Sequence, residues 1–192
     1  MIRALYDWTL ALASHPRALW ALALVSFAES SVFPIPPDVM LLPMILATPH
    51  RAFLIAFVCT AASVAGALLG YAIGAFAFDA LGAPMLTALG KADSFADFTQ
   101  TYNEHGAWVV AIAAFTPLPF KVVTILSGAT GMSVPVFLVT SVFARAARFF
   151  IVATLLWKFG PPIREFIEKR LGLVFTLFVV LLVGSFAALR LL

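Results

Sequence analysis

Charged side chains are scarce in this sequence. Only 11% of its 192 residues are Asp, Glu, Lys or Arg, whereas 63% are hydrophobic, and the mean hydropathy is +1.06. This composition excludes a soluble domain and indicates an integral membrane protein. The apolar runs, at about 18–47, 52–78, 107–131, 134–157 and 172–189, leave no segment that could bury a soluble core of its own. We therefore expect one membrane domain over residues 1–192.

Cysteines and enzyme motifs are equally scarce. The single cysteine, Cys59, excludes a disulfide framework within the chain. His15, His50 and His105 are scattered in predicted connections, and no GxSxG, HExxH or P-loop pattern occurs. The acids and histidines also lack the spacing of metal ligands. We expect no enzymatic activity, no cofactor, no metal and no binding of nucleic acid.

Prolines interrupt the apolar runs at two related positions. The stretch PIPPDV, residues 34–39, aligns with PLPFKV, residues 117–122, at a constant offset of 83. Proline lacks a backbone donor and clashes with the carbonyl four residues earlier, so each stretch must form a turn. The sequence therefore predicts two related halves, about 18–80 and 105–160. The prolines expected at the two tips are Pro34, Pro36, Pro37, Pro117 and Pro119.

The helices that adjoin the two turns are too short to cross a bilayer. A helix from Pro37 to Ala47, or from Gly106 to Thr116, is about 16 Å long, roughly half of a hydrocarbon core of about 30 Å. We therefore predict an all-α membrane protein with an inverted repeat and two re-entrant helical hairpins whose tips lie near the bilayer centre. Three full transmembrane helices remain, at 52–78, 134–157 and about 172–190.

The distribution of basic residues predicts the orientation. In the re-entrant topology, seven Lys and Arg residues lie on the side of the N-terminus and two lie on the other side. Because basic residues accumulate on the cytoplasmic side, the N-terminus is expected there. A plain five-span topology exchanges Arg51 with Lys91 and gives the same bias, so both topologies remain open. Short interfacial helices are expected at 94–104 and from Pro162 onward.

Glycines mark close packing in this reading. Gly66, Gly70 and Gly74 recur every four residues, which puts them on one helix face where another backbone can approach. Gly128 and Gly131 are expected to end the second hairpin, because glycine commonly stops a helix. We assign packing, rather than a binding function, to these glycines.

Five ionisable residues fall inside the apolar runs, where each costs about 2.5–3.5 kcal/mol at mid-membrane. They should therefore face the protein interior and one another. Asp38 would occupy the first turn of a half-helix, where the helix dipole favours an anion. Lys121 occupies the matching place in the second half, and Asp38 is its natural partner. The five residues are Glu29, Asp38, Lys121, Arg145 and Arg148.

Two acids against three bases leave one positive charge unmatched. This excess favours an anionic ligand such as a phosphate head group, with Arg145 or Arg148 as the fork-shaped binder. A buried carboxylate could also carry a proton during transport. The alternative is a self-contained network of ion pairs that only holds the hairpins together.

The sequence resembles the DedA superfamily, also called the SNARE-associated or VTT domain family, and particularly its short bacterial branch. The resemblance covers roughly residues 18–160. It rests on Glu29 followed by the proline turn with Asp38, on the glycine-spaced span with Tyr71, and on FTPLPFK, residues 115–121, followed by Gly128. It differs from larger members in having Lys121 where a tip arginine is usual.

The resemblance implies a multi-pass protein of the bacterial inner membrane that moves lipids between leaflets. Family cargoes would include undecaprenyl phosphate and phospholipids, with protons as a coupling ion and Glu29 and Asp38 at the acidic positions. Our hypothesis is a transporter, or flippase, for an anionic lipid phosphate. The alternatives are a passive scramblase or structural membrane protein and, less favoured, an intramembrane lipid phosphatase.

Overall fold

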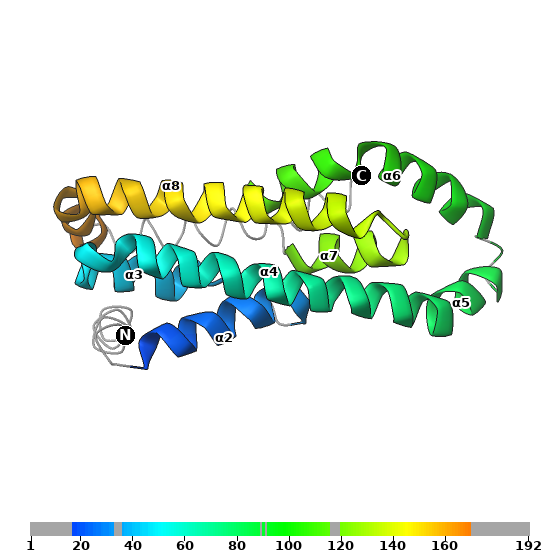
Figure 1. The fold of residues 1–192 in the computed structure, drawn as a ribbon, viewed down its shortest axis with the longest axis horizontal. Coiled ribbons are helices and arrows are strands. Elements are labelled where there is room, and N and C mark those ends of the chain that lie inside the picture. Colours follow the sequence, from blue (N-terminus) through cyan, green and yellow to red (C-terminus); the bar gives the residue numbers. More distant parts are fainter. Residues whose placement is uncertain (1–16, 33–35, 89, 91, 116–119, 170–192) are drawn as a thin grey trace.

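The computed structural model describes residues 17–32, 36–88, 90, 92–115 and 120–169, and Figure 1 shows that this part of the chain is helical. No strand occurs among these residues, so the predicted all-α class is confirmed. The main helices are α2 (Ala18–Ser31), α3 (Asp38–Ala47), α4 (Ala52–Ala77), α6 (Ala92–Phe115), α7 (Phe120–Ala129) and α8 (Val134–Lys169). Short elements connect them, namely η1 (Pro49–Arg51), η2 (Phe78–Gly82) and α5 (Ala83–Ala88).

Two long apolar helices run along the molecule and pack against each other (Figure 1). The segments Pro49–Ala77 and Val134–Gly160 have 29 and 27 residues, and both are long and apolar enough to cross a membrane. They agree with the predicted spans at 52–78 and 134–157. The predicted span at about 172–190 lies outside the described residues.

Helix α8 bends at the end of its long apolar segment, Val134–Gly160. Phe159 has non-helical backbone angles, φ −117° and ψ 18°. The bend precedes Gly160 and the prolines at 161 and 162, whose rings would clash with the carbonyls of Trp157 and Lys158 in a straight helix. A second helical segment therefore follows the kink, as expected from Pro162 onward, although it lies within the bounds of α8; its place at the membrane surface stays a prediction.

Both proline motifs break the helices where the sequence predicts. Helix α2 ends at Ser31 and α3 begins at Asp38, while α6 ends at Phe115 and α7 begins at Phe120. Pro36 and the buried Pro37 lie directly before α3. The other predicted tip residues, Pro34, Pro117 and Pro119, lie outside the described residues.

The four broken helices approach the middle of the molecule from opposite ends. In Figure 1, α2 runs inward and α3 returns to the same end, whereas α6 and α7 do the same from the other end. The order of helices is also the same in both halves, with two broken helices followed by a long one. The repeat itself, and the re-entrance of the hairpins into a membrane, stay predictions.

Helix α6 differs from the prediction of a surface helix followed by a separate arm. It is continuous from Ala92 to Phe115 and includes Gly106, which lies against the side chain of Met132. The Tyr102 hydroxyl lies 3.0 Å from the Ser127 hydroxyl, and Asn103 donates to the Thr130 carbonyl over 2.8 Å. Burial raises the pKa of Tyr102, although its bond with Ser127 opposes the shift. The predicted surface helix is therefore docked on α7.

The predicted packing role of the α4 glycines is confirmed. A Cβ atom added to Gly66 would collide with the Phe27 carbonyl of α2, and one added to Gly74 would collide with the Ile125 carbonyl of α7. Gly70, between them, faces Thr124 of α7 and the carbonyl that ends α2. One face of α4 therefore packs at backbone distance against a helix from each half.

The two glycines predicted to stop the second hairpin have different roles. Gly131 ends α7 in the left-handed region, with φ +63°, and the Met132 N–H bonds back to the Ser127 carbonyl over 3.0 Å, as in a Schellman cap. Gly128 lies inside α7, where a Cβ would collide with the Tyr71 carbonyl of α4. The prediction of a stop is thus correct for Gly131 and wrong for Gly128.

Gly74→Ala tests this backbone packing. On an open helix face the change would stabilise the helix by up to about 1 kcal/mol. Against the Ile125 carbonyl, overpacking should instead lower the free energy of unfolding by about 1–3 kcal/mol. Thermal unfolding of purified protein in detergent measures the sign. Ala61→Val, at an exposed position of the same helix, is the control and should change little; a stabilised Gly74→Ala variant would contradict the packing.

Candidate transport site

The ends of the broken helices bring the predicted ionisable residues next to α8. Arg145 is fully buried, and its Nη2 lies 2.8 Å from Glu29 Oε2, in an ion pair that joins α8 to the end of α2. Its Nε donates to the Ser63 hydroxyl of α4 over 2.6 Å. The Ser63 and Ser30 hydroxyls lie 2.7 Å apart, and Ser30 donates to Glu29 over 3.0 Å. A chain of hydrogen bonds thus runs from the guanidinium through two serines back to the carboxylate.

Aromatic rings supply the rest of the environment of Arg145. Its guanidinium carbon lies over the rings of Phe120 and Phe149, 4.8 Å and 4.7 Å from their centroids. Cation–π attraction is strongest when the cation is desolvated, as it is here. These contacts offset part of the cost of burying the charge, because a buried ion pair is stable only when its remaining polar atoms are satisfied.

Glu29 also joins the two hairpins. Its Oε1 accepts a hydrogen bond of 3.3 Å from the backbone N–H of Phe120, the first residue of α7. The first N–H groups of a helix lack partners within the helix and favour an anion. In the reverse direction, Thr124 of α7 donates to the Ser30 carbonyl near the end of α2 over 3.0 Å. We call Glu29, Ser30, Ser63, Phe120 and Arg145 the buried brace.

The second ion pair is more accessible. Arg148 Nη2 lies 2.6 Å from Asp38 Oδ2, and the side chains are 22% and 20% exposed. Asp38 is the first residue of α3, as predicted, where the helix dipole favours its negative charge. Arg148 Nη1 also donates over 3.4 Å to the carbonyl of Ala114, next to the end of α6. We call Asp38 and Arg148 the outer pair.

The expected pairing of Lys121 with Asp38 is wrong. Lys121 Nζ instead donates to the Val32 carbonyl over 3.2 Å, whereas Asp38 pairs with Arg148. Val32 directly follows α2, and the last carbonyls of a helix lack partners and favour a cation. Lys121 therefore caps the end of α2.

The structure brings together all five predicted ionisable residues around the helix breaks, although in a different pairing. Sequence reasoning missed the brace residues Ser30, Ser63 and Phe120. A signal for the serines exists, since Ser26 and Ser30 in one apolar run, and Cys59 and Ser63 in the next, are each four residues apart. They meet as matched pairs, with Ser26 Oγ 3.0 Å from Cys59 Sγ.

Arg145→Met tests the brace. The change leaves the Glu29 carboxylate buried without its cation, so the free energy of unfolding should fall by about 3–5 kcal/mol. Adding Glu29→Leu removes the unpaired charge and should recover part of the loss, since apolar replacement of a whole buried pair is often neutral. Thermal unfolding in detergent gives the values, with Lys158→Met on exposed α8 surface as the control. Equal effects of Arg145→Met and Lys158→Met would refute the brace.

Comparison with known proteins agrees with the resemblance in the sequence. The model of the VTT domain family matches residues 34–158. An uncharacterized protein of Haemophilus influenzae is 39% identical over 168 residues, which cover 85% of this chain and 87% of the relative. An uncharacterized protein of Histophilus somni matches with the same identity and coverage. No solved structure matches the chain. The chain therefore belongs to the VTT domain family, the DedA superfamily of membrane proteins.

Proposed function

We propose that the protein moves an anionic lipid phosphate, such as undecaprenyl phosphate or an acidic phospholipid, between the leaflets of a membrane. The observation that carries the proposal is the partly exposed outer pair, in which Arg148 of α8 reaches the start of α3 and the end of α6. Charged groups within an apolar span are expensive and typically mark the path of an ion or substrate. Broken helices that end at one place are also the usual surroundings of a transport site.

The charge balance of this region favours an anion. Glu29 and Asp38 are each paired with an arginine, and the Lys121 ammonium has a backbone carbonyl as its partner among the described residues. One positive charge is therefore not balanced by a carboxylate there. A phosphate group could accept hydrogen bonds from the Arg148 guanidinium, whose planar fork suits two phosphate oxygens.

The outer pair also suggests how transport could be coupled to protons. If Arg148 turns to a phosphate, Asp38 loses the cation that pairs with it, and in the proton-coupled version of the proposal it then takes up a proton. A proton would then travel with each exchange. In proton-coupled transport, Asp38 would therefore be the residue that carries the proton.

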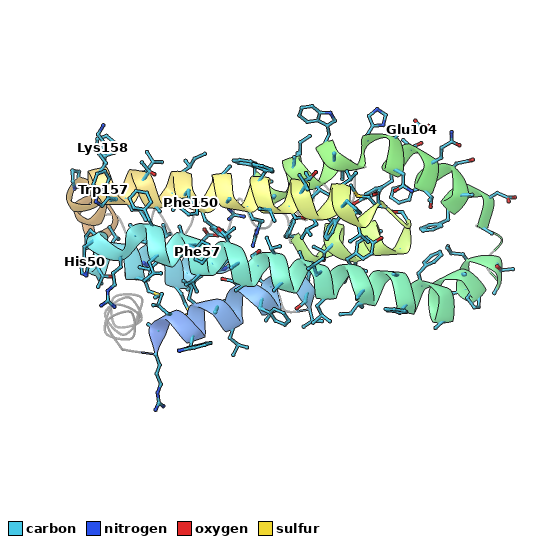
Figure 2. All side chains as sticks on the ribbon, in the orientation of Figure 1. His50, Phe57, Glu104, Phe150, Trp157 and Lys158 are labelled. Carbon is cyan, nitrogen blue, oxygen red and sulfur yellow. The ribbon has the colours of Figure 1, made fainter. Side chains whose placement is uncertain are left out.

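The distribution of charges along the molecule supports an orientation in the membrane. Arg17, Arg51 and Lys158 belong to the end where α2 begins, and the α6 acids Asp93, Asp97 and Glu104 belong to the opposite half; Figure 2 labels Lys158 and Glu104 at the two ends. Basic residues accumulate on the cytoplasmic side. We propose a bacterial inner-membrane protein with two re-entrant hairpins and a cytoplasmic N-terminus.

A passive scramblase, or a structural membrane protein, is the second candidate. It is favoured by the fact that each of the two acids already has an arginine partner. In that case the ion pairs hold the hairpins together and take no part in turnover. Dependence of lipid movement on a pH gradient separates coupled transport from this candidate.

Leaflet exchange in liposomes tests the function. Purified protein should move labelled undecaprenyl phosphate across the bilayer, and Asp38→Asn and Arg148→Ala should each slow it about tenfold or more, as expected for loss of a charge-assisted bond. Lys158→Ala, far from the site, is the matched control. Unchanged rates in both site variants would exclude the proposed role of the outer pair.

Cysteine accessibility tests the topology. In a Cys59→Ala background, His50→Cys and Gln100→Cys report the two ends of the molecule. With re-entrant hairpins, a membrane-impermeant thiol reagent added outside the cell should label position 100 and not position 50. The five-span topology predicts the reverse pattern if the N-terminus is cytoplasmic.

A further inference from the structure

The two ion pairs have the same chemistry and very different surroundings. Arg145 is 0% exposed and Glu29 is 8% exposed, whereas about a fifth of each side chain of the outer pair is exposed. A ligand from outside the protein can therefore reach Arg148 without displacing a helix. The guanidinium of Arg145 has no exposed surface for a ligand to approach.

Among the described residues, the buried Glu29–Arg145 pair also makes more hydrogen bonds than the partly exposed outer pair does. The Glu29 carboxylate accepts from Arg145, from Ser30 and from the Phe120 backbone N–H. Arg145 reaches acceptors on α2 and α4 and lies between two aromatic rings. Exchange of either partner would break contacts among four helices at once, so this pair is built to stay closed.

Arg148 is bound less completely. Among the described residues its acceptors are the Asp38 carboxylate, at 2.6 Å, and the Ala114 carbonyl, at 3.4 Å. The second bond is long, and the Phe149 ring lies 5.7 Å away. Within the described part of the chain, an anion that replaces Asp38 therefore meets one strong competitor, the Asp38 carboxylate itself.

We propose that the two ion pairs divide the work of the proposed transport: Arg148 exchanges Asp38 for the phosphate of the lipid, whereas Glu29 and Arg145 stay paired as positioning residues. This inference rests on the proposed function. The brace positions Lys121 as well, because Glu29 holds the backbone N–H of Phe120, its direct neighbour. Arg148 is thus the specificity-determining cation and selects a head group with an anionic phosphate.

The division of roles predicts opposite effects of two isosteric substitutions on affinity. Asp38→Asn removes the charge that competes with the phosphate for Arg148, so the lipid phosphate should bind more tightly, by about tenfold, even though its transport slows. Glu29→Gln loosens the brace, so it should lower the unfolding temperature and should not tighten binding. A merely structural role of Asp38 would not raise affinity.

Binding of undecaprenyl phosphate to the purified protein in detergent tests the inference, with undecaprenol as the uncharged control. Tighter binding by Asp38→Asn, together with unchanged or weaker binding by Glu29→Gln, supports it. Weaker binding by Asp38→Asn, or tighter binding by both variants, overturns it. If the wild-type protein binds undecaprenyl phosphate and undecaprenol equally well, the proposed function is wrong, and the proposed exchange at Arg148 is wrong with it.

Ser63→Ala keeps the test decisive if Glu29→Gln does not fold. It removes the acceptor of Arg145 Nε and no ionisable group. The variant should unfold at a lower temperature, while its affinity for undecaprenyl phosphate stays within about twofold of wild type, because the side-chain hydrogen bonds of Ser63 within the described part of the chain go to Ser30 and Arg145 and not to the outer pair. Tighter binding by Ser63→Ala, comparable to that of Asp38→Asn, would show that the brace also competes with the ligand and would overturn the division.

Discussion

A guanidinium group without exposed surface lies between the broken helices, and the arrangement of the hairpins depends on satisfying it. Arg145 needs a counter-ion, an acceptor for its Nε and a polarisable lining, because an unpaired buried charge is among the most destabilising features a protein can contain. The counter-ion comes from α2, the acceptor from α4, and one of the two rings from the start of α7. No single half of the chain supplies all of them.

The breaks in the helices allow these groups to surround the Arg145 guanidinium. A helix that stops inside an apolar region leaves carbonyls or N–H groups without partners, and in lipid each of them would be costly. Here the end of α2 receives Lys121 and Thr124, the start of α7 receives Glu29, and the end of α6 receives Arg148. Side chains that neutralise one another therefore also cap the helices, so charge pairing and chain topology have one common cause.

The two arginines of α8 differ in how completely the protein encloses them. One arginine is enclosed by serines and aromatic rings, while the other, one turn along α8, keeps part of its surface exposed. Arg145 and Arg148 are only three residues apart, so they lie on the same face of α8, but their side chains still meet different neighbours. In the transport that we propose, this difference lets the Glu29–Arg145 pair hold the hairpins while Arg148 changes partners.

Much of the fold could be predicted from the sequence, because its signals are local. Prolines fix where α2 and α6 end and where α3 and α7 begin, and the glycine spacing fixes the face of α4 that packs closely. The pairing of charges could not be predicted, because residue spacing gives the depth and the helix face of a side chain but not its partner on another helix. Lys121 and Asp38 are expected to pair with each other, and each has a different partner. The contributions of Ser63 and the Phe120 N–H depend on contacts between distant segments, as does the continuity of α6 through Gly106.

The glycine face of α4 has a consequence for biosynthesis. Gly66 is covered by α2, which the ribosome makes before it, but Gly74 is covered by α7, which is made some 50 residues later. Until α7 has been made and has packed against α4, the nascent chain carries this strip of helix backbone uncovered. The first half therefore completes its own core only when the second half arrives, and a prematurely terminated chain would expose this strip to whatever else occupies the membrane.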